Sequence, residues 1–298
     1  MHQIENEFLR IGVKQTGAEL CSIQSVKNGR EYMWEGDPAI WGNHAPVLFP
    51  IVGGLKDGTY LFEGKSYQLP RHGIVRYNKK VQLVDQDPDA LHFELESDPE
   101  SLTKYPFPFR FRISFSLVAN RLRILHQVEN TGPATMYFSL GAHPAFRCPL
   151  IDGESYADHY LEFEYPETAR TWVLDEKGLI AKEGMLMMDQ SNQLALHEHL
   201  FDADALIFKN LASRRVSLRS RKAGLILRLE YPNWPYLGIW AKPQAPFVCI
   251  EPWQGIADHS ETDQELQTKI GIMQLAAGKR YAAEYVIELG EELLTSSR

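Results

Sequence analysis

The sequence has few of the features that mark secretion, membrane insertion or a disulfide framework. Its three cysteines, Cys21, Cys148 and Cys249, are odd in number and lie far apart along the 298 residues. Such cysteines match no metal-ligand spacing and are typical of a reducing compartment. No apolar run approaches the ~20 residues that a membrane-spanning helix needs, and the first residues lack the basic and apolar regions of a signal peptide. We therefore expect a cytoplasmic protein without a membrane partner.

Excess basic charge and the common phosphate and nucleophile motifs are also missing. With 31 basic and 39 acidic residues the net charge is −8, which argues against a nucleic-acid partner. Gly53-Gly54 does not fit a phosphate-binding loop, and the chain has no Gly-x-Ser-x-Gly nucleophile elbow. No long amphipathic helix, linker or internal repeat is found. These absences leave a globular protein with an apolar content of 44%.

Alternating polar and apolar residues are the main structural signal. Residues 109–117 place Phe and Leu side chains on one face and Arg and Ser side chains on the other, and 122–128 repeat the pattern after a short turn. This predicts an antiparallel hairpin with one buried face, whose charged side, including Arg121 and Arg123, faces solvent. Asn28-Gly29 predicts a second hairpin turn.

Further strands are expected along the rest of the chain, at residues 8–13, 20–26, 205–208, 216–219, 225–231, 236–240, 247–251 and 281–289. Residues 150–205 are less regular, and we expect a short helix within 189–201 and a core gap filled by Met185, Met187 and Met188. The economical interpretation is an all-β fold, with residues 1–298 as one large antiparallel domain and few short helices.

Three short segments carry residues suited to chemistry. His143 lies in Leu140–Phe146 between small residues, and Pro144 biases it toward an extended conformation at a strand end. His72 lies in Pro70-Arg71-His72-Gly73, with Arg76 nearby. Glu251 ends an apolar run in Cys249–Trp253, where a carboxylate is costly to bury unless it is paired or used. Taken alone, the two histidine segments favour a structural role, and the Glu251 segment is equally consistent with a structural or a functional one.

Together these segments, with Leu48–Gly53 ahead of them, resemble the aldose 1-epimerase (galactose mutarotase) family, most closely its LacX-like branch. The resemblance runs from about Phe8 to Leu289 in the same order. It implies one large antiparallel β-sandwich, the galactose mutarotase-like supersandwich. It also implies an isomerase of carbohydrate metabolism that interconverts the α and β anomers of a small sugar, with a site on a concave sheet face and with no cofactor and no metal.

The resemblance also implies roles for particular residues. His143 matches the acid that protonates the ring oxygen, Glu251 the base that takes the C1 hydroxyl proton, and His72 a second histidine at the sugar. A carboxylate beside His143 is expected to keep its imidazole charged. We expect Arg71 and Arg76 to contact substrate, and Phe49 and Trp240 to wall the cleft. A metal site at His197 and His199 has no third ligand in the sequence.

Two departures from the family pattern leave the substrate open. Gly54 stands where relatives often have an arginine, and the aspartate that grips sugar hydroxyls in relatives has no evident counterpart. A hexose-phosphate mutarotase, with Arg71, Arg76 or Lys79 on the phosphate, and a non-catalytic carbohydrate-binding protein remain alternatives. The sequence does not fix the sugar or the oligomeric state.

Overall fold

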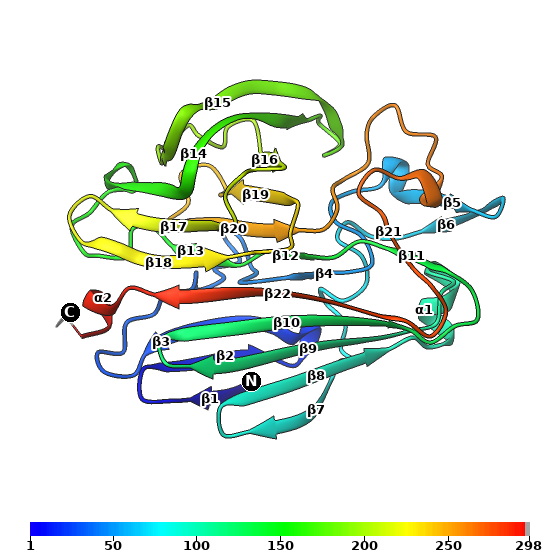
Figure 1. Ribbon diagram of the computed structural model, residues 1–298, viewed down its shortest axis with the longest axis horizontal. Coiled ribbons are helices and arrows are strands. Elements are labelled where there is room, and N and C mark those ends of the chain that lie inside the picture. The colour runs from blue at the N-terminus through cyan, green and yellow to red at the C-terminus, as the bar shows by residue number, and fades with distance from the viewer. Residues whose placement is uncertain (296–298) are drawn as a thin grey trace.

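The computed structural model describes residues 1–295 and consists mainly of antiparallel strands (Figure 1). Most strands belong to one 15-stranded sheet. The order along it is β4 (Val47–Leu48), β12 (Gly141–Ala142), β20 (Phe247–Trp253), β19 (Tyr236–Trp240), β16 (Leu206–Lys209), β14 (His159–Leu174), β17 (Arg215–Ser220), β18 (Gly224–Glu230), β22 (Arg280–Leu289), β10 (Arg121–Asn130), β9 (Phe109–Val118), β8 (Ala90–Glu96) and β7 (Gln82–Asp87). Two further strands join at the side, β13 (Ala145–Arg147) on β20 and β15 (Ile180–Ala195) on β14.

Smaller elements complete the fold. A 3-stranded sheet contains β1 (His2–Glu5), β2 (Leu9–Lys14) and β3 (Glu19–Ser25), and two strand pairs are β5 (Thr59–Phe62) with β6 (Lys65–Gln68) and β11 (Met136–Phe138) with β21 (Met273–Leu275). The α-helices are short, α1 (Pro99–Lys104) and α2 (Glu291–Thr295). No helix among residues 1–295 is long and apolar enough to cross a membrane.

The large sheet curves so that its distant strands face one another across a common core. Phe49, which follows β4, stacks on Phe111 of β9 with ring centroids 4.7 Å apart, although the two strands lie near opposite ends of the strand order. The 3-stranded sheet packs beside β8, where His2 contacts Phe93. Aromatic side chains thus fill the space between sheet layers, as a sandwich requires.

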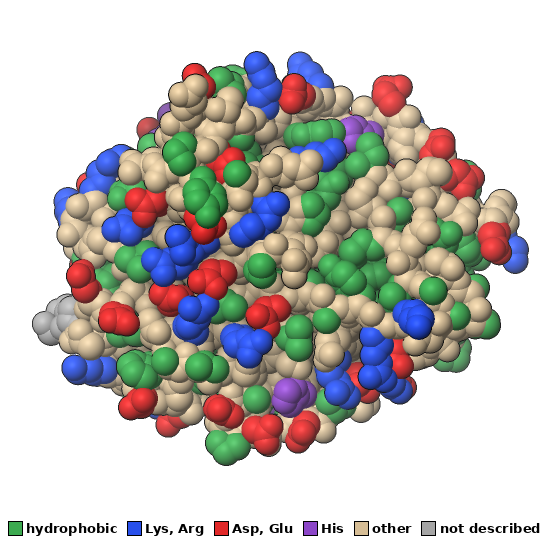
Figure 2. All heavy atoms as spheres, viewed as in Figure 1, with side chains coloured by type: hydrophobic (Ala, Val, Ile, Leu, Met, Phe, Trp, Pro, Cys, Tyr) green, Lys and Arg blue, Asp and Glu red, His purple; other side chains and the backbone are tan. Residues whose placement is uncertain are grey.

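The predicted hairpin and its faces are confirmed. β9 and β10 pair in continuous register, and the apolar face of β9 is buried while its Arg and Ser face is half-buried or exposed. The inward alternation predicted for 281–289 is also confirmed in β22. On the polar face, arginines and glutamates from neighbouring strands form ion pairs, such as Arg112–Glu94 and Arg123–Glu284. Figure 2 shows acidic and basic side chains interspersed there.

The expectation for residues 150–205 is wrong. They form the two longest strands, β14 and β15, which arch over the rest of the molecule in Figure 1, and most of the predicted helix at 189–201 is strand. Met188 is buried, but Met185 is 73% exposed and fills no core gap. The physical reason is that β15 is exposed along most of its length, so its sequence lacks the apolar alternation by which strands are recognised.

Candidate active site

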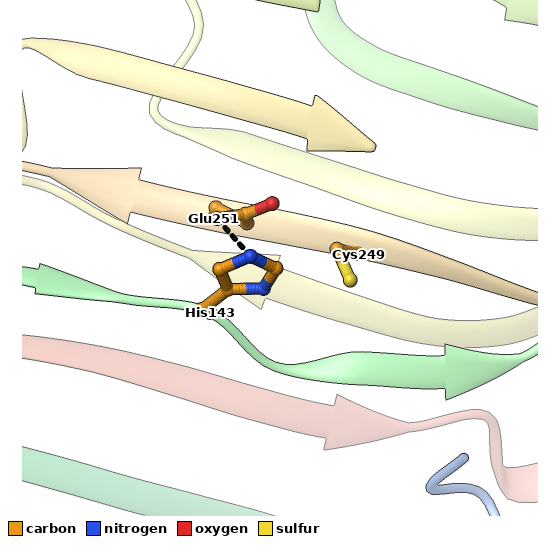
Figure 3. Close-up of side chains that lie close together, drawn as sticks. All are labelled: His143, Cys249 and Glu251. Carbon is orange, nitrogen blue, oxygen red and sulfur yellow. Dashed lines mark ion pairs between the residues drawn. The ribbon is translucent and has the colours of Figure 1, made fainter. Parts of the chain in front are cut away.

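Strand register brings the two principal candidates together. β12 and β13 both pair with β20, through Gly141 opposite Trp253 and Ala145 opposite Cys249. Antiparallel pairing at both ends sets His143, which lies between the two short strands, opposite Glu251. The imidazole Nε2 is 3.3 Å from the Glu251 carboxylate, with 11% of the His143 side chain and 1% of the Glu251 side chain exposed (Figure 3).

Aromatic rings fix the orientation of the His143 imidazole. Trp41 stacks on it with ring centroids 5.0 Å apart, and Trp240 meets it edge-on at 5.7 Å. Its Nδ1 atom is buried without a hydrogen-bond partner. The ring is therefore positioned by packing, and its one polar contact is directed at Glu251.

His72 is held by its own backbone and by Gly53. The backbone N–H of Gly53 donates a hydrogen bond of 3.2 Å to His72 Nδ1, so the neutral ring carries its hydrogen on Nε2. His72 adopts a φ of 70°, which is strained for a residue with a side chain. Strained backbone conformations of this kind are concentrated at functional sites. Burial lowers the pKa of His72 well below its usual value, and the positive charges of Arg71 and Arg76 act in the same direction, so the ring is a neutral donor.

The glycine after His72 is required by its surroundings. Gly73 has a φ of 78° and pairs with Phe49, and a Cβ on it would stand 2.2 Å from the Phe49 carbonyl oxygen. Any larger residue would push the two segments apart and displace His72. The sequence Pro70-Arg71-His72-Gly73 thus encodes one tight turn that delivers the imidazole.

These side chains surround a cavity of about 280 Å³. Its wall contains every predicted site residue except Phe49. The full lining comes from several strands and loops: Trp41, Gly53, Arg71, His72, Arg76, His143, Leu174, Asp204, Ala205, Ile207, Trp240, Glu251, Trp253 and Ala257. The mixture of indole rings, carboxylates, imidazoles and guanidiniums suits a small polar ligand with apolar faces.

The prediction that Phe49 walls the cleft is wrong. Its side chain is fully buried in the hydrophobic core, against Phe111, Phe109 and Tyr105. Its backbone, not its ring, serves the site by pairing with Gly73. In contrast, Trp240 and the two arginines line the cavity as expected.

Two wall residues carry no signal in the sequence analysis, Trp41 and Asp204. Trp41 lies in a loop between β3 and β4, and Asp204 precedes β16 with a φ of 75°. Asp204 contributes negative charge near Glu251 and is the second carboxylate of the cavity. No local pattern distinguishes either residue, because only the folded chain brings these loops to β20.

The space beside Gly54, where a larger side chain would fit, is close to the Arg71 side chain, which comes from another loop. A Cβ on Gly54 would stand 3.8 Å from the carbonyl oxygen of Gly178, and the Arg71 guanidinium lies directly against Gly178. Arg71 therefore brings a guanidinium close to the position from which an arginine at residue 54 would extend.

The protonation states differ from the expectation that Glu251 keeps His143 charged. Burial raises the pKa of Glu251 well above its usual value, and the nearby Asp204 adds to this. Burial lowers the pKa of His143 to about 3, and the charges of Arg76 and Arg71 act in the same direction. Desolvation therefore favours the uncharged form of each partner: the imidazole is harder to protonate and the carboxyl harder to ionise than in solvent.

Fold and site together define an all-β protein with a buried histidine–glutamate pair at the wall of a cavity of the size of a small ligand. The comparisons with known proteins agree with this class. The family model described as aldose 1-epimerase matches residues 1–272, so the chain belongs to the aldose 1-epimerase family. Members of a sugar epimerase family are expected to bind a small carbohydrate.

Individual relatives are similar along nearly their whole length. The plasmid-encoded protein LacX of Lactococcus lactis is 34% identical over 276 residues, which cover 90% of this chain and 92% of LacX. A galactose mutarotase related enzyme from Lactobacillus acidophilus is 33% identical with a TM-score of 0.91, covering 98% of this chain and 97% of that one. A galactose mutarotase-like protein from Lactobacillus casei is 29% identical with a TM-score of 0.90, covering 97% and 100%. The galactose mutarotase-like fold is therefore confirmed.

Proposed function

We propose that the protein is a mutarotase that interconverts the α and β anomers of a free hexose, with His143 and Glu251 as its acid–base pair. The observation that carries the proposal is the 3.3 Å contact between these two side chains at the wall of a cavity of about 280 Å³. Anomerisation needs one group to take a proton from the C1 hydroxyl and another to protonate the ring oxygen.

The proton balance of the pair fits this reaction. Transfer of the Glu251 proton to His143 across their contact produces a carboxylate and an imidazolium without changing the net charge. The carboxylate takes the O1 proton, the C1–O5 bond breaks as the C1=O1 bond forms, and O5 receives the imidazolium proton. Both groups are then neutral, which is the state that burial favours. Rotation about C1–C2 and the reverse steps close the ring on its other face.

Other wall residues are assigned to binding. The neutral Nε2–H of His72 donates to the ring oxygen or a neighbouring hydroxyl, and Asp204 accepts from sugar hydroxyls. Trp240 and Trp41 present apolar rings to the C–H faces of the sugar. Every role in the proposed reaction is filled by a side chain of this chain.

Polarimetry on freshly dissolved α-glucose and α-galactose tests the proposal. We expect the approach to anomeric equilibrium to accelerate in proportion to protein concentration with at least one of these sugars. A protein that binds a sugar, by calorimetry, without accelerating its anomerisation would be a carbohydrate-binding protein on the same fold, and the proposal would be wrong.

The two arginines favour a hexose-phosphate mutarotase as a second candidate. Within residues 1–295, Arg71 and Arg76 form no ion pair with a carboxylate, yet both line the cavity. They also line a neighbouring cavity of about 380 Å³, whose wall includes Lys79. Unpaired guanidiniums at the junction of two cavities suit a phosphate group attached to the sugar.

NMR exchange spectroscopy on hexoses and hexose 6-phosphates separates the two candidates. A hexose-phosphate mutarotase is expected to exchange the phosphorylated anomers faster, and Arg76→Gln to remove that preference while free-sugar exchange persists. Equal rates for both substrates in the wild type and in Arg76→Gln would favour the free hexose.

A further inference from the structure

One buried side chain beside the acid–base pair has no role in the proposed reaction. Cys249 lies two residues before Glu251 on β20, so both side chains project from the same face of the strand. Cys249 Sγ, a ring nitrogen of His143 and a carboxylate oxygen of Glu251 all lie within 4.8 Å of one another (Figure 3). Among residues 1–295 this is the group of His, Cys and carboxylate side chains that could hold a metal ion.

The distances are close to those of a zinc site. Ligand nitrogen and oxygen atoms about 2.0–2.2 Å from a tetrahedral Zn²⁺ lie roughly 3.3 Å apart. The separation of His143 Nε2 and Glu251 Oε2 is 3.3 Å. A sulfur ligand is expected roughly 3.6 Å from each of them, so relative to the 4.8 Å that bounds the cluster the Cys249 sulfur needs to approach by roughly 1.2 Å.

The site also has unfilled coordination capacity. Glu251 Oε2 is buried without a hydrogen-bond partner, and the side chain is 1% exposed. The cavity lined by His143 and Glu251 provides an entry path and space for a water molecule as fourth ligand. A thiolate and a carboxylate carry two negative charges, so they neutralise a divalent cation within the buried site.

We propose that His143, Cys249 and Glu251 form an inhibitory binding site for a thiophilic divalent cation of the Zn²⁺ class. The cation occupies both members of the acid–base pair, so it blocks proton transfer instead of assisting it. The second imidazole nitrogen of His143 has no hydrogen-bond partner. Resident metal ions usually have such a partner on each histidine ligand, so this site suits reversible binding. Only the inhibition rests on the proposed function, since binding does not require turnover.

Direct binding measurements on the full chain test the site. We expect isothermal titration with ZnCl₂ to show one equivalent bound by the wild type, and CoCl₂ to give a thiolate-to-cobalt charge-transfer band. Cys249→Ser should weaken Zn²⁺ binding at least 10-fold and remove the band. Cys21→Ser is the matched control, because this half-exposed cysteine lies elsewhere in the fold and should leave both signals unchanged.

Anomerisation assays then test the consequence. Zn²⁺ should inhibit the wild type and Cys21→Ser, sugar should protect against it, and Cys249→Ser should keep its basal rate while losing the inhibition. Cys249→Ala replaces the serine variant if the latter does not fold. Equal Zn²⁺ binding by wild type and Cys249→Ser, or no binding by the wild type, would overturn the site. The titration and the cobalt spectrum decide this even for a chain that accelerates no sugar.

Discussion

The polar face of the β8–β10 region and the wall of the site cavity differ in how their ionisable side chains are paired and buried. On the polar face, Arg112 lies 2.8 Å from Glu94, and the Arg112 side chain is 45% exposed. In the cavity, Arg71 and Arg76 have no carboxylate partner among the described residues, while Glu251 and His143 are buried together, and burial shifts both of their pKa values toward the uncharged forms. Paired charges in solvent contribute little to stability, whereas ionisable groups that are buried, as Glu251 and His143 are, are costly. The costly arrangement occurs where the chemistry is proposed.

The largest effect is expected from Glu251→Gln. The amide cannot accept the C1 hydroxyl proton, so the anomerisation rate should fall about 10²–10⁴-fold. Polarimetry measures the rate, and circular dichroism confirms that the fold is kept. His143→Asn should have a comparable effect, and full activity in either variant would remove the proposed pair.

His72→Asn is expected to have a smaller effect that is divided between binding and rate. The variant loses the Nε2–H donor that Gly53 orients, and one hydrogen bond to a neutral ligand contributes about 0.5–1.5 kcal/mol. KM should therefore rise by up to about 10-fold, with a further loss in kcat. An unchanged KM would make His72 a structural residue only.

The pH dependence of the free energy of unfolding should show how much burial of Glu251 costs. Because its pKa is raised in the folded protein, Glu251 stabilises the fold at pH values below its unfolded pKa, and this contribution is lost as pH rises through the folded pKa. Glu251→Gln should thus melt at a higher temperature than the wild type at pH 8, by about 2–4 °C for each kcal/mol gained. The difference should shrink toward pH 4.5. A lower melting temperature of Glu251→Gln than of the wild type at pH 8 would contradict a raised pKa of the buried Glu251 carboxyl.

The smallest effect is expected on the polar face. Arg112→Ala removes an ion pair whose arginine is exposed, and Glu94 keeps Arg110 as a second partner at 3.6 Å, so we expect a change in the free energy of unfolding within about 0.5 kcal/mol. Urea denaturation measures this difference. A loss of several kcal/mol would mean that an ion pair on the polar face matters as much for stability as the buried pair in the cavity, and would contradict the contrast between them.

Much of the fold was predictable because its signal is local. β9, β10 and β22 alternate buried and exposed residues, so their apolar faces are visible in the sequence. β15 gives no such signal, because solvent covers most of it and no alternation is required there. The first half of β14 does alternate buried and half-buried residues, so a signal for this strand is present in the sequence. Phe49 was misassigned for a related reason: an aromatic residue beside a motif can point into the core as readily as into a cleft.

The sequence alone determined which residue types are available. These are the His143 imidazole after two small residues, the Glu251 carboxylate after an apolar run, and His72 before a glycine that its surroundings require. The tertiary structure decided that β20 carries Glu251 opposite His143, and that Trp41 and Asp204 arrive from distant loops. It also decided the direction in which the pKa values of the pair shift, because desolvation depends on everything packed around a group and not on its neighbours in the chain.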